Sequence, residues 1–180
     1  MRVRRMTAAD IEAVSELRVR AWQFAYADLM PRSYLASMSV AEDAARRREM
    51  FAAGPGTVTN LLTEADGGRI TGWAALGPYR PEGPHGHGRP HEDAELYALY
   101  VRPELIGTGV GRALMSTCLE RAAAQDFPRL LLWVIRANAR ARRFYEHAGF
   151  ALDGAQDTHD VEGTRVPLVR YARPLLKDAV

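Results

Sequence analysis

A glycine-rich stretch in the middle of the chain has the composition of an anion-binding loop. Gly107, Gly109 and Gly111 alternate through LIGTGVGRAL, after a strand-like run and before a helix-like one. Glycines at the start of a helix let backbone N–H groups close around a phosphate, and the helix dipole favours negative charge there. Arg112, just inside the expected helix, adds a positive charge. The stretch therefore predicts a phosphate-binding turn built from main-chain amides.

Two common phosphate-binding motifs do not fit this loop. The dinucleotide fingerprint requires glycine at its sixth position, which counted from Gly107 is Arg112. A P-loop requires lysine and then serine or threonine after its last glycine, where this sequence has Arg112 and Ala113. The loop therefore argues against a nucleotide-binding enzyme.

The segments around the loop alternate between helical and strand patterns. Apolar residues recur at helical spacing from Ile11 to Ala25, Pro31 restarts a helical stretch, and a further helix ends at Gly54. Strands are predicted at 3–6, 57–65, 69–77, 94–101, 129–135, 150–155 and 165–172, and helices at 110–124 and 138–149. This order predicts one mixed α/β domain.

The composition is that of an ordinary globular protein with a sizeable core. Apolar residues make up 47% of the 180 residues and charged residues 26%. The net charge is only +2, and no basic run is interleaved with aromatics, so nucleic-acid binding is not indicated. Cys118 is the single cysteine, which excludes an intrachain disulfide and a cysteine-based zinc site. The sequence has no signal-peptide pattern and no membrane-spanning run, so we expect a cytoplasmic protein without a membrane partner.

The glycine loop and a second motif together resemble the acetyl-CoA-binding core of the GNAT superfamily of N-acetyltransferases. The similarity runs from about Glu95 to Phe150, through LYVRPELIGTGVGRALM and then NARARRFYEHAGF. Gly109 and Gly111 occupy the family's glycine positions, whereas Ile106 stands where arginine or glutamine is usual. The resemblance implies an α/β (α+β) domain over 1–180, with a mostly antiparallel mixed sheet and helices on both faces. Within it, 1–55 would form the acceptor side and 95–150 the cofactor-binding core.

The resemblance also implies acetyl-CoA as the cosubstrate, with no metal. The strand at 129–135 should splay away from the strand at 94–101 and open a slot for the cofactor. The residues implied in cofactor binding are Leu99, Tyr100, Val101, Gly107, Thr108, Gly109, Val110, Gly111, Arg112 and Asn138. Asn138 is equally explained as a helix N-cap, and the two roles are compatible.

Two residues match the family's catalytic positions. Glu95 corresponds to a general base that takes the proton of the acceptor amine, directly or through a water. Its alternative is a solvent-exposed glutamate at a strand edge, and Glu92 and Asp93 are the nearest substitutes. Tyr145 corresponds to the tyrosine that protonates the departing thiolate, and its alternative is a core aromatic. A base is useful because a lysine-like amine, with a pKa of about 10.4, is almost entirely protonated at pH 7.

The acceptor side carries fewer signals. The segment AWQFAY resembles the acceptor-side helix of many bacterial members, so Trp22 and Tyr26 are expected in the acceptor pocket, although core packing also explains Trp22. The acceptor is an amine on a small molecule or a peptide, and the family is compatible with a homodimer.

Two further groups of residues have more than one interpretation. The loop 81–90 and its neighbour contain His85, His87 and His91, which are explained by an ordinary loop, by a lid over the acceptor site or, least well, by a metal site. Four arginines near the last helix either reach the ribose phosphate of the cofactor or form a solvated helix face. They are Arg136, Arg140, Arg142 and Arg143.

The sequence thus predicts an acetyl-CoA-dependent N-acetyltransferase that transfers directly to a primary amine. The alternative is a non-catalytic acyl-CoA-binding sensor of the same fold. The presence of both Glu95 and Tyr145 favours the enzyme.

Overall fold

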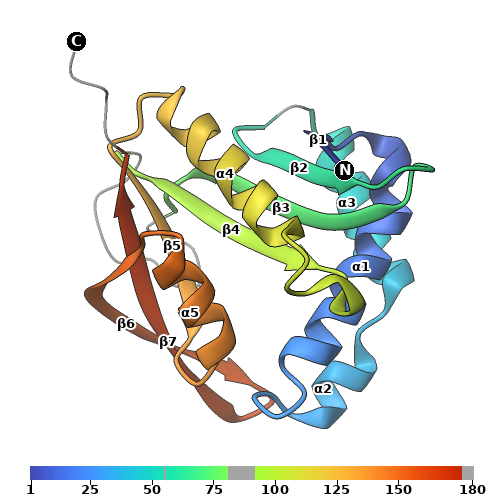
Figure 1. Cartoon of the computed structure of the whole chain (residues 1–180). Coiled ribbons are helices and arrows are strands. Elements are labelled where there is room, and N and C mark those ends of the chain that lie inside the picture. Colours follow the sequence, from blue (N-terminus) through green and yellow to red (C-terminus); the bar gives the residue numbers. More distant parts are fainter. Residues whose placement is uncertain (55, 81–91, 176–180) are drawn as a thin grey trace.

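A seven-stranded sheet forms the centre of the computed structural model, which describes residues 1–54, 56–80 and 92–175 (Figure 1). Its strand order is β1-β2-β3-β4-β5-β7-β6; β4 and β5 run parallel, and the other neighbours in the described sheet run antiparallel. The strands are β1 (Arg2–Arg5), β2 (Thr59–Glu64), β3 (Ile70–Pro78), β4 (Ala94–Val101), β5 (Arg129–Ile135), β6 (Ala151–Val161) and β7 (Thr164–Pro174). The helices are α1 (Ile11–Ala25), α2 (Arg32–Ser37), α3 (Val40–Ala52), α4 (Val110–Ala123) and α5 (Ala139–His147), with short 3-10 turns η1 (Ala8–Asp10) and η2 (Pro103–Leu105).

Helices cover both faces of the sheet, and alternation along the strands decides which face each side chain joins. On β3, Ala74 and Leu76 pack against α4, whereas Trp73 and Ala75 pack against α1 and α3. In Figure 1, α4 and α5 lie on one face, and α1 with α3 lies on the other. The predicted fold class, with helices on both faces of a mostly antiparallel sheet, is therefore confirmed.

Helix α4 approaches the sheet most closely over Gly72 of β3. A Cβ atom at Gly72 would lie 2.7 Å from Thr63 Oγ1 and 2.9 Å from both Val110 and Leu114 side-chain carbons. Such distances are shorter than van der Waals contact, so only glycine allows this approach. Because Val110 is the first residue of α4, Gly72 sets where the N-terminus of that helix lies.

The N-terminal strand is tied to the first helix by a half-buried ion cluster. Asp10 accepts two hydrogen bonds from the Arg4 guanidinium, at 2.7 and 2.8 Å, and one from the backbone N–H of Thr7 at 2.8 Å. Arg4 also binds Glu64 on β2. Thr7 and Asp10 form a capping box at the start of η1, and the same Asp10 carboxylate secures β1 through Arg4.

The last hairpin is longer than the sequence predicts. A strand was expected at 150–155, whereas β6 continues to Val161 and turns at Glu162 and Gly163, both with positive φ, into β7. Polar residues such as those at 156–160 have weak strand preference. Their pairing with β7 explains why β6 extends to Val161, and this pairing cannot be predicted from the local sequence.

Across the described residues, no helix combines the length and the apolar character needed to cross a bilayer.

Replacing Gly72 with alanine should displace the start of α4 and lower the free energy of unfolding by about 1–3 kcal/mol, because the added methyl has no space. Chemical denaturation measures the change. Gly56→Ala is the matched control, since nothing lies within 4 Å of a Cβ there. Equal stability of the two variants would contradict the close packing at Gly72.

The Asp10 cluster predicts a pH-dependent contribution to stability. The Arg4 hydrogen bonds lower the pKa of Asp10 to about 2, so its stabilisation is complete above pH 4 and is lost as the pH falls toward 2. Asp10→Asn should lower the free energy of unfolding at pH 7 by about 2 kcal/mol. Denaturant titrations from pH 7 to pH 2 should show this difference vanish. Asp66→Asn, at a fully exposed carboxylate, should show no such trend.

Candidate functional site

The sheet opens between its two parallel strands. β4 and β5 pair only at Ala94 with Leu130 and at Glu95 with Leu131. Beyond these pairs, β4 continues along β3 and β5 continues along β7, so the two strands diverge (Figure 1). The register of β4 against β3 shifts at the same point, which leaves Tyr97 as an extra residue in a bulge. The predicted splay of 129–135 away from 94–101 is confirmed.

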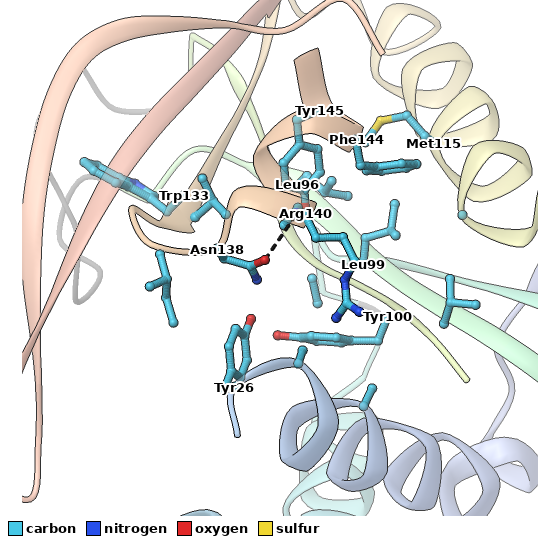
Figure 2. A pocket seen from close by; sticks show the side chains of 18 of the residues that line it. Tyr26, Leu96, Leu99, Tyr100, Met115, Trp133, Asn138, Arg140, Phe144 and Tyr145 are labelled. Atoms are coloured by element: carbon cyan, nitrogen blue, oxygen red, sulfur yellow. Dashed lines mark hydrogen bonds between the residues drawn. The ribbon is translucent and has the colours of Figure 1, made fainter. Parts of the chain in front are cut away.

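A cavity of about 730 Å³ occupies this opening, which we call the slit. Its walls come from α1, β4, the loop before α4, β5, α5 and the β6–β7 hairpin (Figure 2). Segments far apart in the sequence therefore meet at the point where β4 and β5 part. Predicted site residues that line it are Trp22, Tyr26, Glu95, Leu99, Tyr100, Val101, Gly107, Gly109, Gly111, Arg112, Asn138 and Tyr145.

The glycine loop leads into α4 at one end of the slit. Gly107 and Gly109 have φ of 87° and 96°, a conformation that side-chain-bearing residues rarely adopt, and a Cβ at either would meet no atom within 4 Å. The first N–H groups of α4 have no partner within the helix, so this turn presents donors to an anion.

Thr108 and Val110 do not line the cavity, unlike the rest of the predicted loop residues. The Thr108 hydroxyl donates to the Leu105 carbonyl at 2.7 Å, and Val110 is buried toward Gly72. Any contact between these two residues and a ligand in the cavity would therefore come from their main-chain atoms.

Helix α5 and its N-cap place Tyr145 and Asn138 on the wall of the slit. Asn138 is buried, and its Oδ1 accepts the Ala141 N–H at 3.1 Å, so the predicted N-cap is confirmed (Figure 2). Tyr145 packs edge-on against Phe144 and Phe150. Burial, together with the nearby Tyr100 and Cys118, raises the pKa of Tyr145 above its usual value. Its phenol therefore keeps its proton at neutral pH.

Glu95 is buried in the slit rather than exposed at a strand edge. Its carboxylate accepts the Arg80 N–H at 3.3 Å and lies 3.6 Å from the Arg80 guanidinium. Neither nearby acid lines the cavity: Glu92 is exposed, and Asp93 is held by Arg129 at 2.6 Å. Among the three acids named from the sequence, Glu95 is therefore the one placed in the slit.

The α1 side of the slit is an ordered aromatic cluster. Trp22 lies 5.0 Å from Tyr26 and 6.3 Å from Tyr100, and Tyr100 stacks on Trp73 at 6.0 Å. Trp22 is half-buried, packs within this cluster and lines the cavity.

Two arginines and a buried aspartate hold this cluster from behind. Arg18 lies over the Trp22 ring at 4.7 Å, and Arg47 lies over the Trp73 ring at 4.1 Å. Asp43 accepts from both guanidiniums, at 2.8 and 2.7 Å. Cation–π contact and ion pairing thus fix the rings in place.

The structure separates the four arginines near α5. Arg140 lines the slit, 5.0 Å above the exposed Phe24 ring, whereas Arg142 donates to the Tyr171 hydroxyl and Arg136 to Gln156. Arg143 is exposed outside the cavity. The sequence could not distinguish them, because they share one short segment.

Several lining residues carry no signal in the sequence. Trp133 is part of a continuous apolar run that predicts only a buried strand, and Arg80 and His159 lie far from the motifs. The exposed Ile106 also lines the slit.

Cys118 and the histidine loop lie outside this arrangement. Cys118 is fully buried against the sheet, and burial raises the pKa of its thiol to about 12, so it packs as a small apolar residue. His85, His87 and His91 lie outside the described residues. Within 1–54, 56–80 and 92–175, no cluster of three or more metal-binding side chains occurs.

Solved structures share this fold over nearly the whole chain. The PaiA N-acetyltransferase from Thermoplasma acidophilum in complex with coenzyme A has a TM-score of 0.70 at 19% identity, covering 96% of this chain and 98% of that one. YncA from Salmonella typhimurium with its cofactor acetyl-CoA has a TM-score of 0.72 at 22% identity, covering 100% and 96%. At these identities the similarity shows the fold.

Sequence comparisons identify the family. The uncharacterized N-acetyltransferase YuaI of Bacillus subtilis (strain 168) is 26% identical over 172 residues, which cover 96% of this chain and 92% of that protein. The uncharacterized N-acetyltransferase Mb2688 of Mycobacterium bovis is 38% identical over 96 residues, 53% of this chain and 55% of that protein. The model of the acetyltransferase (GNAT) family matches residues 11–150. The chain therefore belongs to the acetyltransferase (GNAT) family, as its glycine loop and its Asn138-to-Phe150 motif predict.

Proposed function

We propose that the protein is an acetyl-CoA-dependent N-acetyltransferase that moves an acetyl group directly to a primary amine. The observation that carries the proposal is the slit itself: one opening has the glycine turn at one end, with Glu95 and Tyr145 on its walls. The PaiA and YncA structures, which hold coenzyme A and acetyl-CoA, support the choice of cosubstrate.

The described residues fit this cosubstrate. Open space over Gly107 and Gly109 leaves room for a pyrophosphate at the start of α4, and Arg112 adds charge at the same place. Ile106 supplies no charged side chain, so main-chain amides of the turn would bear most of the binding. Backbone groups of 99–101, which β5 does not pair, would hold the pantetheine arm like an added strand.

Acetyl-CoA, when bound, supplies an activated thioester, and the protein aligns it with the amine. The amine nitrogen bonds to the carbonyl carbon, the carbon–sulfur bond breaks, and the nitrogen gives up a proton. Alignment of this kind is worth roughly 7–11 kcal/mol. A backbone N–H freed by the Tyr97 bulge would stabilise the carbonyl oxygen as it gains charge.

Glu95 would take the proton of the amine through water. Its carboxylate lines the slit two residues before Tyr97, where the freed backbone N–H is proposed to hold the carbonyl oxygen. A water between the carboxylate and the amine can carry the proton from the nitrogen to Glu95.

Tyr145 would give its proton to the departing sulfur. A thiol has a pKa near 8.5, well below the raised pKa of this phenol, so the phenolate left by the transfer would take a proton back from solvent, which completes the step. The proposed layout therefore places acceptor recognition in 1–55 and cofactor binding in 95–150 of one domain over 1–180.

A panel of peptide, amino-acid, aminoglycoside, polyamine and simple amine acceptors, monitored by release of free coenzyme A, tests the function. We expect turnover with at least one amine. Binding of acetyl-CoA without turnover across the whole panel would instead support a non-catalytic acyl-CoA sensor.

Tyr145→Phe should lower kcat by about a hundredfold or more and leave the affinity for acetyl-CoA nearly unchanged, because it removes only the proton donor. Because the pKa of Tyr145 is raised, loss of this proton should not limit the parent enzyme at pH 9. Glu95→Gln should also lower kcat. Tyr171→Phe is the control: it loses a 2.6 Å hydrogen bond to Glu146 outside the slit and should keep the parent kcat. A Tyr145→Phe enzyme as fast as the parent would remove the assigned role.

Asn138 variants separate its two roles. Asn138→Ala should lower the free energy of unfolding by about 1 kcal/mol through loss of the helix cap, whereas Asn138→Asp should keep the cap. If the side chain also binds the pantetheine arm, Asn138→Asp will raise the KM for acetyl-CoA at unchanged stability. An unchanged KM in Asn138→Asp would leave only the capping role.

A further inference from the structure

The two faces of β4 present different chemistry to the slit. Leu99 packs with the α4 core, on the side of the glycine turn and Tyr145, whereas Tyr100 packs with the α1 core. The backbone of β4 therefore separates the side proposed for the cofactor from a second side, which faces α1. The second side is where an acceptor would enter.

Two phenols meet on that second side, and we call Tyr26 and Tyr100 the phenol pair. Figure 2 shows their hydroxyl ends turned toward each other and toward the Asn138 wall. Burial and the neighbouring Tyr100 hydroxyl raise the pKa of Tyr26, and burial raises that of Tyr100. Both stay neutral near pH 7, so each oxygen can accept one N–H from a ligand. Trp22 and Trp73 hold both rings in place.

An apolar surface continues from the phenol pair, and we call it the apolar wall. Its members come from β5, β7 and the turn after α1, and all of them line the cavity while packing in one cluster. They are Met30, Trp133, Ile135, Val166 and Leu168.

The charges that line the slit disfavour an acceptor with several positive charges. Among the described lining residues, Glu95 is the only carboxylate, and it is already paired with Arg80, while Arg112 and Arg140 add positive charge. A polycation would meet repulsion there with few compensating acids. A small amine on an apolar body would bury that body against the apolar wall.

We infer that the acceptor is a primary amine on an apolar, ring-sized body, of the arylalkylamine class, with its nitrogen held by Tyr26 and Tyr100. The inference rests on the proposed acetyl transfer. A primary amine, once deprotonated, keeps two N–H groups and one lone pair. The two phenol oxygens accept the two N–H groups, and the lone pair is left to attack the carbonyl carbon.

Three probe amines test the substrate class: 2-phenylethylamine, its N-methyl derivative and spermidine. With acetyl-CoA, kcat/KM for 2-phenylethylamine should exceed that for spermidine at least tenfold. The N-methyl derivative should be slower than its parent amine, because it has one N–H fewer. A higher kcat/KM for spermidine or for a peptide N-terminus would overturn the inference and leave the acetyltransferase function standing.

Phenylalanine variants test the phenol pair. Tyr26→Phe and Tyr100→Phe should each raise the KM for 2-phenylethylamine about 3- to 10-fold, the effect of one lost hydrogen bond, with the KM for acetyl-CoA unchanged. Tyr34→Phe is the matched control, since Tyr34 lies 6.4 Å from the same Trp22 ring but does not line the cavity.

An unchanged KM for 2-phenylethylamine in both variants would refute the assignment of the nitrogen to the phenol pair. Acetyl-CoA binding without turnover of any acceptor would refute the proposed function, and the inference with it. The two failures are therefore distinguishable by the same assay.

Discussion

The divergence of β4 and β5 is the constraint on which the site depends. The two strands pair only at Ala94 and Glu95 of β4. Beyond these residues β4 continues along β3, and β5 continues along β7. A strand that loses one neighbour leaves N–H and C=O groups without strand partners on that side. In an uninterrupted sheet these backbone groups of β4 would form hydrogen bonds with β5. Here they line a cavity, and the bulge at Tyr97 bends β4 where the gap begins.

Packing on the two faces of the sheet keeps the slit in shape. Gly72 lets α4 lie close enough for its N-terminus to reach one end of the opening. On the other face, Asp43 orients Arg18 and Arg47 against the rings that support Tyr100. An isolated surface ion pair contributes little, but a buried carboxylate with two guanidiniums fixes geometry, and an aligned reaction requires fixed geometry.

Short-range features were predictable because neighbouring residues determine them. The glycine turn, the Asn138 cap and the helical stripe of α1 each depend on residues within a few positions of one another. The length of β6 was not predictable, because its outer half is a strand only through pairing with β7. The roles of the arginines near α5 were equally hidden, since the direction of each depends on what lies across from it.

The order of the amino acids was sufficient for the family, for the mostly antiparallel sheet with helices on both faces, and for Glu95 and Tyr145 as candidates. These conclusions rest on motifs that can be recognised from the spacing of residues in the sequence alone. Only the folded chain brought Tyr26 from the end of α1 beside Tyr100 of β4, packed Tyr26 against β5 and β7, and turned Arg140 into the slit. Such contacts join residues separated by long stretches of sequence. Strand register and helix packing create these contacts, and neither can be predicted from a local sequence pattern.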